Sequence, residues 1–357
     1  MGNSTGTIVR RWGGRAVALA VTGVGLYVVA PSLLTMFDAW PQLADVEVRW
    51  FVVLAALELC SFAALWWLTR IALTPGTDGE PRPEEDGVPA PGPPGWGTLA
   101  VAQMAGNAAS KIIPGGAAAG AVVQGKVLVS AGQPGGAVAS AMAATGLLGT
   151  AVLMLLPVLT VPALLIGPPP AEQLQLGLLV SLIIATVIVA VGVTALTWPR
   201  IVAAVGRALG TVIHLVRRPV TADGVEQALL FERARIASAF SGRWWHAVIA
   251  AAANRMFDYA ALVAALVAFG VYARPAEVLL AYVVAQAFAV IPITPGGVGF
   301  VDAGLTTLLV VIGVPADTAV IGTLLYRLFS FWLPIPIGAA AWGWWALRHQ
   351  PPQSAAA

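Results

Sequence analysis

The chain has 357 residues, of which 59% are hydrophobic and only 10% are charged, whereas about 25% of the residues in a soluble domain are charged. One core cannot bury so much apolar surface, so the composition predicts a polytopic membrane protein. The formal net charge of +2 gives no reason to expect a nucleic-acid partner.

Apolar segments occur in chain order at 16–37, 50–69, 98–131, 137–166, 174–197, 245–270, 277–312 and 318–346. Six of them fit single spans of roughly 20 residues or more. The first follows Arg10, Arg11 and Arg15, but no small-residue cleavage site follows it, so we read a retained span rather than a signal peptide. Pro157 and Pro162 predict a kink in the fourth segment.

The segments 98–131 and 277–312 differ from the other six because each carries Pro-Gly-Gly near its middle. The two motifs are Pro114, Gly115, Gly116 and Pro295, Gly296, Gly297. Each leg has about 16 residues, or roughly 24 Å of helix, which is short for a hydrocarbon core of about 30 Å. Proline ends a helix and glycine permits a reversal, so we expect two helix–break–helix hairpins.

An internal repeat relates the two hairpins. A shift of 181 residues gives eight identities over positions 112–134. The matched pairs are Ile112/Ile293, Pro114/Pro295, Gly115/Gly296, Gly116/Gly297, Leu128/Leu309, Val129/Val310, Gly132/Gly313 and Pro134/Pro315. Three single spans separate the hairpins, so they should enter from opposite faces of the membrane. We predict an all-α fold of about six full spans plus two hairpins, arranged as the inverted repeat common in transporters.

The distribution of positive charge predicts the orientation. With the N-terminus in the cytoplasm, thirteen arginines fall on cytoplasmic segments, whereas Arg49 and Arg274 alone fall on external ones. This bias indicates a multi-pass protein of the plasma membrane with both termini cytoplasmic. The expected units are the N-terminus 1–15, two spans 16–70, a disordered Pro/Gly-rich linker 71–97, repeat one 98–197, a basic cytoplasmic segment 198–244, repeat two 245–346 and the tail 347–357. The basic segment either rests on anionic headgroups or only sets the topology.

Charged residues inside the apolar segments are candidates for function, because a charge at a span centre costs at least about 2.5–3.5 kcal/mol. Arg255 and Asp258 are three residues apart, so they can share a helical face and pair. Asp302 is a candidate partner for Arg327 or Arg255. Glu58 has no evident partner and is either a proton-titrating group or a hydrogen-bonded structural acid.

The hairpin tips have two interpretations. Each second leg begins just after its glycines, so its N-terminal amides and partial positive charge can bind an anion inside a wet cavity. Alternatively, the glycines only allow close helix packing. Lys111, directly before the first motif, adds to a surplus of buried cations over acids that favours an anionic ligand. Lys126 is expected to reach the cytoplasmic surface.

Residues 291–338 resemble the flippase-like membrane domain of lysylphosphatidylglycerol synthases and its stand-alone relatives. The residues that match the family pattern are Pro292, Pro295, Gly296, Gly297, Gly299, Asp302, Gly313, Val314, Ala319 and Arg327. The family usually has Glu at the position of Asp302. Many members carry acidic and arginine residues where this chain has Ala121 and Gln124, which weakens the case for a charged role of the first hairpin. The resemblance covers roughly 98–346.

This resemblance implies movement of phospholipids or glycolipids between leaflets, without the aminoacyl-transferase domain, because the chain ends eleven residues after the last span. The leading hypothesis is a flippase for an anionic phospholipid, glycolipid or polyprenyl-phosphate-linked lipid. Its candidate headgroup site comprises Pro295, Gly296, Gly297, Gly299, Asp302, Arg327, Arg255, Asp258, Lys111, Pro114, Gly115 and Gly116. The alternative is a non-transporting membrane partner of a cell-envelope lipid or glycan enzyme. The oligomeric state is left open.

An enzyme is not expected, because the sequence shows no constellation of catalytic residues. His214, His246 and His349 lie far apart, and Cys60 is the single cysteine, so neither a metal nor another cofactor is expected. The sequence also lacks the Gly-x-x-x-x-Gly-Lys-Ser/Thr motif of ATP-binding loops. A gradient or metabolic consumption must then supply any energy for transport.

The orientation can be tested with single cysteines at positions 45, 80, 170 and 220 in a Cys60→Ser background. An impermeant thiol reagent should label positions 45 and 170 in intact cells, and positions 80 and 220 only after permeabilisation. Labelling of positions 45 and 170 only after permeabilisation would overturn the predicted topology.

Overall fold

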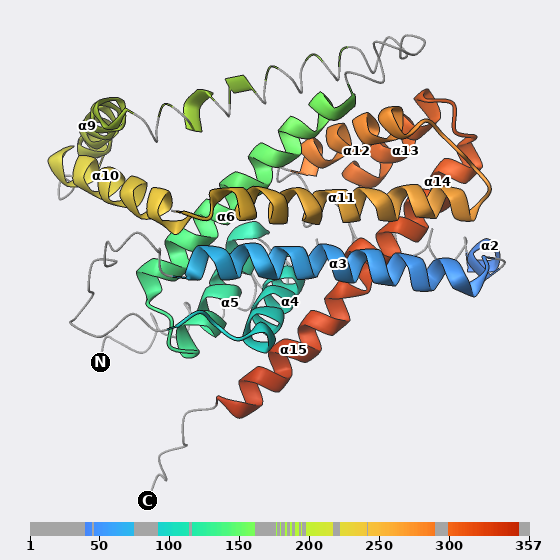
Figure 1. Ribbon diagram of the computed structural model, residues 1–357, viewed down its shortest axis with the longest axis horizontal. Coiled ribbons are helices and arrows are strands. Elements are labelled where there is room, and N and C mark those ends of the chain that lie inside the picture. Colours follow the sequence, from blue (N-terminus) through green and yellow to red (C-terminus); the bar gives the residue numbers. More distant parts are fainter. Residues whose placement is uncertain are drawn as a thin grey trace, which may run out of the picture.

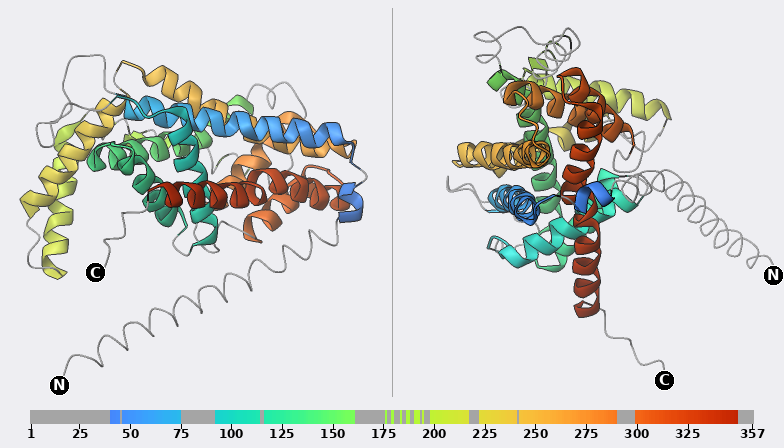
Figure 2. Two further views of the ribbon diagram at one scale, coloured as in Figure 1. Left: turned by 90° about the horizontal axis from the view of Figure 1, so that it is seen from below. Right: turned by 90° about the vertical axis from the view of Figure 1, so that its right-hand side faces the viewer.

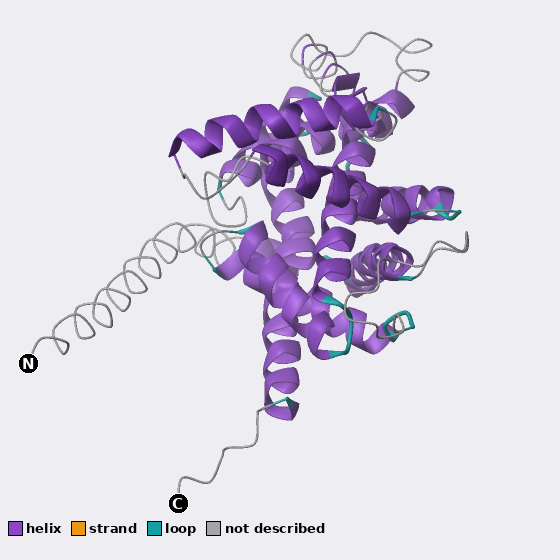
Figure 3. Ribbon diagram, turned by 90° about the vertical axis from the view of Figure 1, so that its left-hand side faces the viewer, coloured by secondary structure: helices purple, strands orange, loops and turns teal. Residues whose placement is uncertain are grey.

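The computed structural model describes residues 40–44, 46–74, 92–113, 116–160, 198–216, 222–240, 242–289 and 299–349, together with isolated positions between 176 and 194. Every regular element in these ranges is a helix (Figure 3). The helices are α2 (Trp40–Ala44), α3 (Val48–Leu73), α4 (Trp96–Ile112), α5 (Ala117–Ser130), α6 (Gly135–Leu155), α9 (Pro199–Val216), α10 (Ala222–Ala239), α11 (Trp244–Ala268), α12 (Pro275–Ala289), α13 (Phe300–Val311), α14 (Ala316–Arg327) and α15 (Pro334–Arg348). A 3₁₀ turn, η1 (Leu156–Thr160), follows α6, and a π-helical turn, η3 (Leu328–Trp332), joins α14 to α15.

Four helical stretches are long and apolar enough to cross a membrane, namely Val48–Leu73, Gly135–Thr160, Trp244–Ala268 and Ala316–Arg348. They agree with four of the six predicted single spans. The predicted span 16–37, and all but isolated positions of 174–197, lie outside the described residues. Large apolar side chains such as Val52, Leu147 and Leu347 are exposed on these helices, as expected where a surface faces lipid.

In each of the two segments predicted as hairpins, the structure has two separate helices. The first comprises α4 and α5, and the second comprises α12 and α13. Gly116, which caps α5, has φ 50° and ψ −120°, a conformation that strongly favours glycine. Pro114, Gly115 and the whole second motif lie outside the described residues.

The C-terminal ends of the two hairpins have the same backbone geometry. Gly132 (φ 90°) and Gly313 (φ 92°) occupy equivalent positions after α5 and α13. In each copy the next residue donates its N–H to a leucine carbonyl five residues back, that of Leu128 at 3.2 Å or Leu309 at 3.0 Å. The eight sequence identities therefore include residues that end the second leg of each hairpin by one and the same turn.

Helices α3 and α11 lie side by side and antiparallel (Figure 1). Near their middles, the Asn254 amide donates to the carbonyl and the hydroxyl of Ser61, and that hydroxyl donates to the Asn254 carbonyl. At one end, Arg243 donates to the Thr74 carbonyl at 2.8 Å. The same order of elements follows each helix: α3 precedes α4, α5 and α6, whereas α11 precedes α12, α13 and α14.

Close helix packing depends on glycines other than those in the two motifs. A Cβ atom on Gly120 of α5 would lie 2.6 Å from the carbonyl oxygen of Gly106 of α4. A Cβ atom on Gly338 of α15 would lie only 2.1 Å from the carbonyl oxygen of Met104. Helix α4 is therefore held between α5 and α15 by contacts that only glycine allows.

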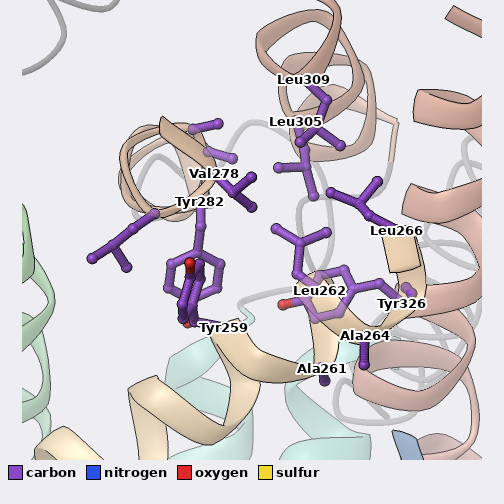
Figure 4. Close-up of a cluster of buried hydrophobic side chains, with 14 of the residues drawn as sticks. Tyr259, Ala261, Leu262, Ala264, Leu266, Val278, Tyr282, Leu305, Leu309 and Tyr326 are labelled. Carbon is purple, nitrogen blue, oxygen red and sulfur yellow. The ribbon is translucent and has the colours of Figure 1, made fainter. Parts of the chain in front are cut away.

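The largest core cluster lies mainly in the second half of the chain (Figure 4), and the first half adds Leu43, Val46, Leu54, Leu153, Met154 and Leu156. Leu262 of α11, Tyr282 of α12, Leu309 of α13 and Leu325 of α14 are almost completely buried in it. The right-hand view in Figure 2 shows α15 extending away from the other C-terminal helices, and α15 packs against α4.

Three features refine the predicted segments. The last segment is interrupted by η3, because Pro334 and Pro336 lack the N–H groups that would continue an α-helix. Helix α3 extends to Leu73, into the expected linker, since its last three residues are buried. The basic segment 198–244 contains two helices, α9 and α10. Pro157 does coincide with a change from α-helix to 3₁₀ geometry, whereas Pro162 lies outside the described residues.

Because α15 packs closely against α4, two glycine substitutions on α15 should differ in their effect on the stability of the protein. Gly338→Ala should lower the free energy of unfolding by at least about 1–3 kcal/mol, because the added methyl overlaps the Met104 backbone. Gly343→Ala meets nothing within 4 Å and should leave stability unchanged or raise it by up to about 1 kcal/mol. Thermal unfolding in detergent measures both, and equal midpoints would contradict the close contact.

Candidate functional site

A cavity of about 630 Å³ lies between α3, α4, α5, α6, α11, the last turns of α12 and the α14–η3 junction. This volume is typical of a small-molecule site. Its polar lining residues are Glu58, Ser61, Gln103, Asn107, Ser110, Lys111, Gln124, Thr145, Asn254, Arg255, Asp258, Gln286, Tyr326, Arg327 and Ser330. Few of them are adjacent in sequence, so the fold gathers them from both halves of the chain.

Five ionisable side chains that the sequence places inside apolar segments meet in this cavity. Glu58 comes from α3, Lys111 from α4, Arg255 and Asp258 from α11, and Arg327 from the end of α14. Among the described residues no group of three or more His, Cys, Asp and Glu could hold a metal ion. The site is therefore a mixed cluster of guanidinium, ammonium and carboxylate groups.

Asp258 is surrounded by neutral hydrogen-bond donors. The Tyr282 hydroxyl donates to its Oδ2 at 2.6 Å, and the Gln286 amide donates to the same oxygen at 3.1 Å. The Tyr326 hydroxyl donates to Oδ1 at 2.9 Å. Both carboxylate oxygens thus have protein partners, which ties α11 to α12 and α14.

The expected ion pair between Arg255 and Asp258 is not formed. Both residues lie on α11 and line the cavity, but no ion pair joins them in the part of the chain that the structure describes. The reason is that Asp258 already accepts from Tyr282, Tyr326 and Gln286. The Nε of Arg255 is buried without a hydrogen-bond partner, so this guanidinium is available to a ligand.

Lys111 compensates for the interruption of the last span. Its Nζ donates to the carbonyls of Ser330 at 2.9 Å and Phe331 at 3.2 Å, and lies 4.6 Å from the Phe331 ring centroid. In an uninterrupted α-helix the Ser330 carbonyl would accept from residue 334, which is a proline without an N–H. The lysine of the first hairpin therefore caps a broken helix of the second half.

Arg327 pairs with Asp302, as one of the two sequence alternatives predicted. Its Nε donates to Asp302 Oδ1, while Asp302 Oδ2 accepts the Gly299 N–H at 3.0 Å. Gly299 has φ 80° and caps α13, so one carboxylate both ends the second break and anchors α14. Asp302 and Gly299 do not belong to the cavity lining, whereas Arg327 does.

Several buried polar atoms in the cavity lining have no hydrogen-bond partner. They are Oε1 of Glu58, Oδ1 of Asn107, Nε of Arg255, Nη2 of Arg327 and Oγ of Ser330. Buried polar atoms are normally satisfied, so five such atoms around one cavity indicate a place for a polar ligand or water. Two of them are guanidinium donors, which match phosphate or carboxylate oxygens.

The hairpin tips are only partly described. Gly116 and Ala117, at the N-terminus of α5, line the cavity, which agrees with the expectation that this helix end faces a polar interior. Pro114, Gly115, Pro295, Gly296 and Gly297 remain predictions, because they lie outside the described residues.

Sequence analysis missed most of the neutral polar residues of the site. Gln286 and Ser330 stand among apolar residues and Tyr326 directly precedes Arg327, where each also fits a structural role. Only the tertiary fold shows that they share the cavity with Asp258 and Lys111. The sequence did contain a signal for these residues, because a polar side chain within an apolar helix usually has a polar partner.

Comparison with known families gives one match. The family model described as "Lysylphosphatidylglycerol synthase TM region" matches residues 15–338, which include both hairpins and every charged residue of the cavity. Searches of curated proteins and of solved structures found no match.

The pair of Asp302 and Arg327 generates a stability prediction. Asp302→Ala should cost about 3 kcal/mol, because it leaves a largely buried guanidinium unpaired and removes the cap of α13. Asp302→Asn should cost less, since an amide oxygen can still accept the Gly299 N–H.

The double variant Asp302→Asn/Arg327→Gln should be more stable than the sum of its single variants, as expected for a coupled pair. Glu47→Gln is the control, since its pair with Arg49 is exposed and contributes little. Thermal unfolding midpoints report the differences, and strictly additive effects of the two single changes would contradict a stabilising ion pair.

Proposed function

The chain belongs to the lysylphosphatidylglycerol synthase TM region family, and on that premise we propose that it carries the headgroup of an anionic lipid between the two leaflets. The protein is a membrane protein of a family associated with lipid metabolism or transport. The proposed substrate is a phospholipid, glycolipid or polyprenyl-phosphate-linked lipid. Its headgroup would enter the cavity while its hydrocarbon tails stay in the bilayer.

The observation that carries this proposal is a pair of guanidinium groups with unused donors in one cavity. Arg255 Nε and Arg327 Nη2 are both buried and unpartnered. Arginine presents a planar set of donors that fits phosphate oxygens, and a charge-assisted bond of this kind is about twice as strong as a neutral one. The N-terminal end of α5 at Gly116 adds amide donors on the same lining.

The arrangement of the helices supports a transport mechanism. The units α3–α6 and α11–α14 share one order of elements, and their first helices run antiparallel. We therefore propose that they are inverted repeats, that the cavity lies between them, and that rocking of one unit against the other exposes it to each leaflet in turn. The positive-inside bias supports a plasma-membrane protein with cytoplasmic termini.

Removing the charge of Arg255 should weaken headgroup binding without lowering the stability of the protein. In phosphatidylcholine vesicles containing fluorescently tail-labelled phosphatidylglycerol, Arg255→Gln should slow transfer between leaflets by about 10–100-fold, the value of one charge-assisted hydrogen bond. Its thermal midpoint should change little, because Arg255 takes part in no ion pair of the described residues.

Arg274→Gln is the matched control, since Arg274 lies in an exposed pair with Glu277 outside the cavity. It should transfer lipid at the wild-type rate. If wild-type protein transfers no labelled lipid above the rate of protein-free vesicles, with phosphatidylglycerol or with a polyprenyl phosphate, the role of a non-transporting partner of an envelope enzyme is favoured instead.

A further inference from the structure

Glu58 lies near the middle of α3 and is only 6% exposed. It lines the cavity, and its Oε1 has no hydrogen-bond partner. One turn further along the helix, Ser61 is fully engaged with Asn254 of α11. Burying a carboxyl oxygen without a hydrogen-bond donor costs free energy. The fold therefore retains at Glu58 a carboxyl group whose hydrogen-bonding capacity the protein does not fill.

The charged and titratable groups that face Glu58 come from three neighbouring elements. Helix α11 contributes Arg255 and Asp258, α4 contributes Lys111, and the end of α14 contributes Tyr326 and Arg327. In the described lining, α5 and α6 contribute no titratable side chain.

Most of these neighbours are already occupied by fixed partners. Lys111 is held by the carbonyls of η3, and Arg327 is held by Asp302. Asp258 accepts from three neutral donors. No cation is therefore bonded to Glu58, and it lacks the partners expected of a purely structural acid.

The other acid of the described cavity lining is Asp258. Both carboxyl groups line the same cavity. Two carboxyl groups that share one site do not both ionise readily, because their charges repel in a medium of low dielectric. Asp258 accepts hydrogen bonds from three fixed neutral donors, whereas Oε1 of Glu58 accepts none, so Glu58 is the carboxyl group with an oxygen free to take a proton.

We infer that Glu58 is a proton-carrying site, and that each anionic headgroup moves through the cavity together with one proton bound to this carboxyl group. The inference rests on the proposed lipid transport. A hydronium ion on the loading side gives its proton to a Glu58 oxygen and becomes water. After the cavity opens to the other side, that O–H bond breaks and water there takes the proton.

Coupling follows from the charges of the site. A phosphate bound by Arg255 neutralises the one guanidinium of the described cavity lining that has no protein anion as partner, and it brings further negative charge toward Glu58. Phosphate binding therefore favours the protonated form of Glu58, and by reciprocity protonation favours phosphate binding. With Arg255 and one proton beside it, the bound phosphate belongs to a site of smaller net charge than the phosphate alone. A smaller net charge lowers the cost of moving the headgroup through the bilayer interior.

A pH gradient tests this coupling. Wild-type protein is reconstituted in phosphatidylcholine vesicles with tail-labelled phosphatidylglycerol, and a gradient of one pH unit is imposed in either direction. One proton per lipid allows at most about a tenfold accumulation per pH unit. Net transfer should run toward the alkaline side, reverse with the gradient, and disappear with a protonophore. In Glu58→Gln the two directions should become equal, whereas Glu47→Gln, at the exposed start of the same helix, should behave as wild type.

The outcomes separate this inference from the proposed function. If wild-type protein transfers lipid at rates that ignore the gradient, proton coupling is wrong while lipid transport stands. If no transfer occurs, the proposed function fails, and infrared difference spectra then decide the role of Glu58. A protonated-carboxyl band that grows when phosphatidylglycerol is added, and is missing in Glu58→Gln, supports a lipid-linked proton site. A band that phosphatidylglycerol does not change overturns it, even where Glu58→Gln is too unstable to reconstitute.

Discussion

The hydrogen bonds to Asp258 are the interaction on which the rest of the structure depends. A carboxylate inside an apolar helix bundle is stable only where donors surround it. Tyr282, Gln286 and Tyr326 provide those donors, so α11, α12 and α14 must pack in one relative position around the carboxylate. The large core cluster then forms beside this polar centre, and Arg255 is left without an intrahelical partner, facing the cavity.

Interrupted helices place further polar groups where the cavity needs them. Proline at 334 deprives a carbonyl of its donor, and Lys111 of the first hairpin supplies the replacement. Glycine at 299 ends the second break with a turn that Asp302 closes. These two interruptions are each stabilised by a charged side chain, and each of these side chains links elements far apart in the sequence. The cavity borders the first break and the π-helical turn because freed backbone groups and charged caps occur together there.

Small residues and charged residues have complementary roles. Gly106 and Gly120 allow α4 and α5 to touch along the cavity wall, and Gly338 brings α15 against the other side of α4. This close packing fixes the helix that carries Lys111, and with it the geometry of η3. Glycine thus serves close packing at these three positions outside the Pro-Gly-Gly motifs, whereas the backbone conformation of Gly116 requires glycine for a different reason, a turn at the lining of the site.

The sequence by itself determined the class of protein, four candidate spans that the structure contains, and the end of α4 at the first Pro-Gly-Gly motif, because apolar length and helix-breaking residues act locally. It also identified Glu58, Lys111, Arg255, Asp258 and Arg327 as charges that needed an explanation, and it proposed the partner of Asp302. Only the tertiary structure decided how those charges are paired. The spacing of Arg255 and Asp258 on one helix favoured an ion pair between them. Instead, the Asp258 carboxylate accepts hydrogen bonds from Tyr282 of α12 and Tyr326 of α14, which are 24 and 68 positions away in the sequence. Which hydrogen bonds form in a buried polar cluster depends on which helices are in contact. Those contacts are set by packing across the whole chain rather than by local sequence.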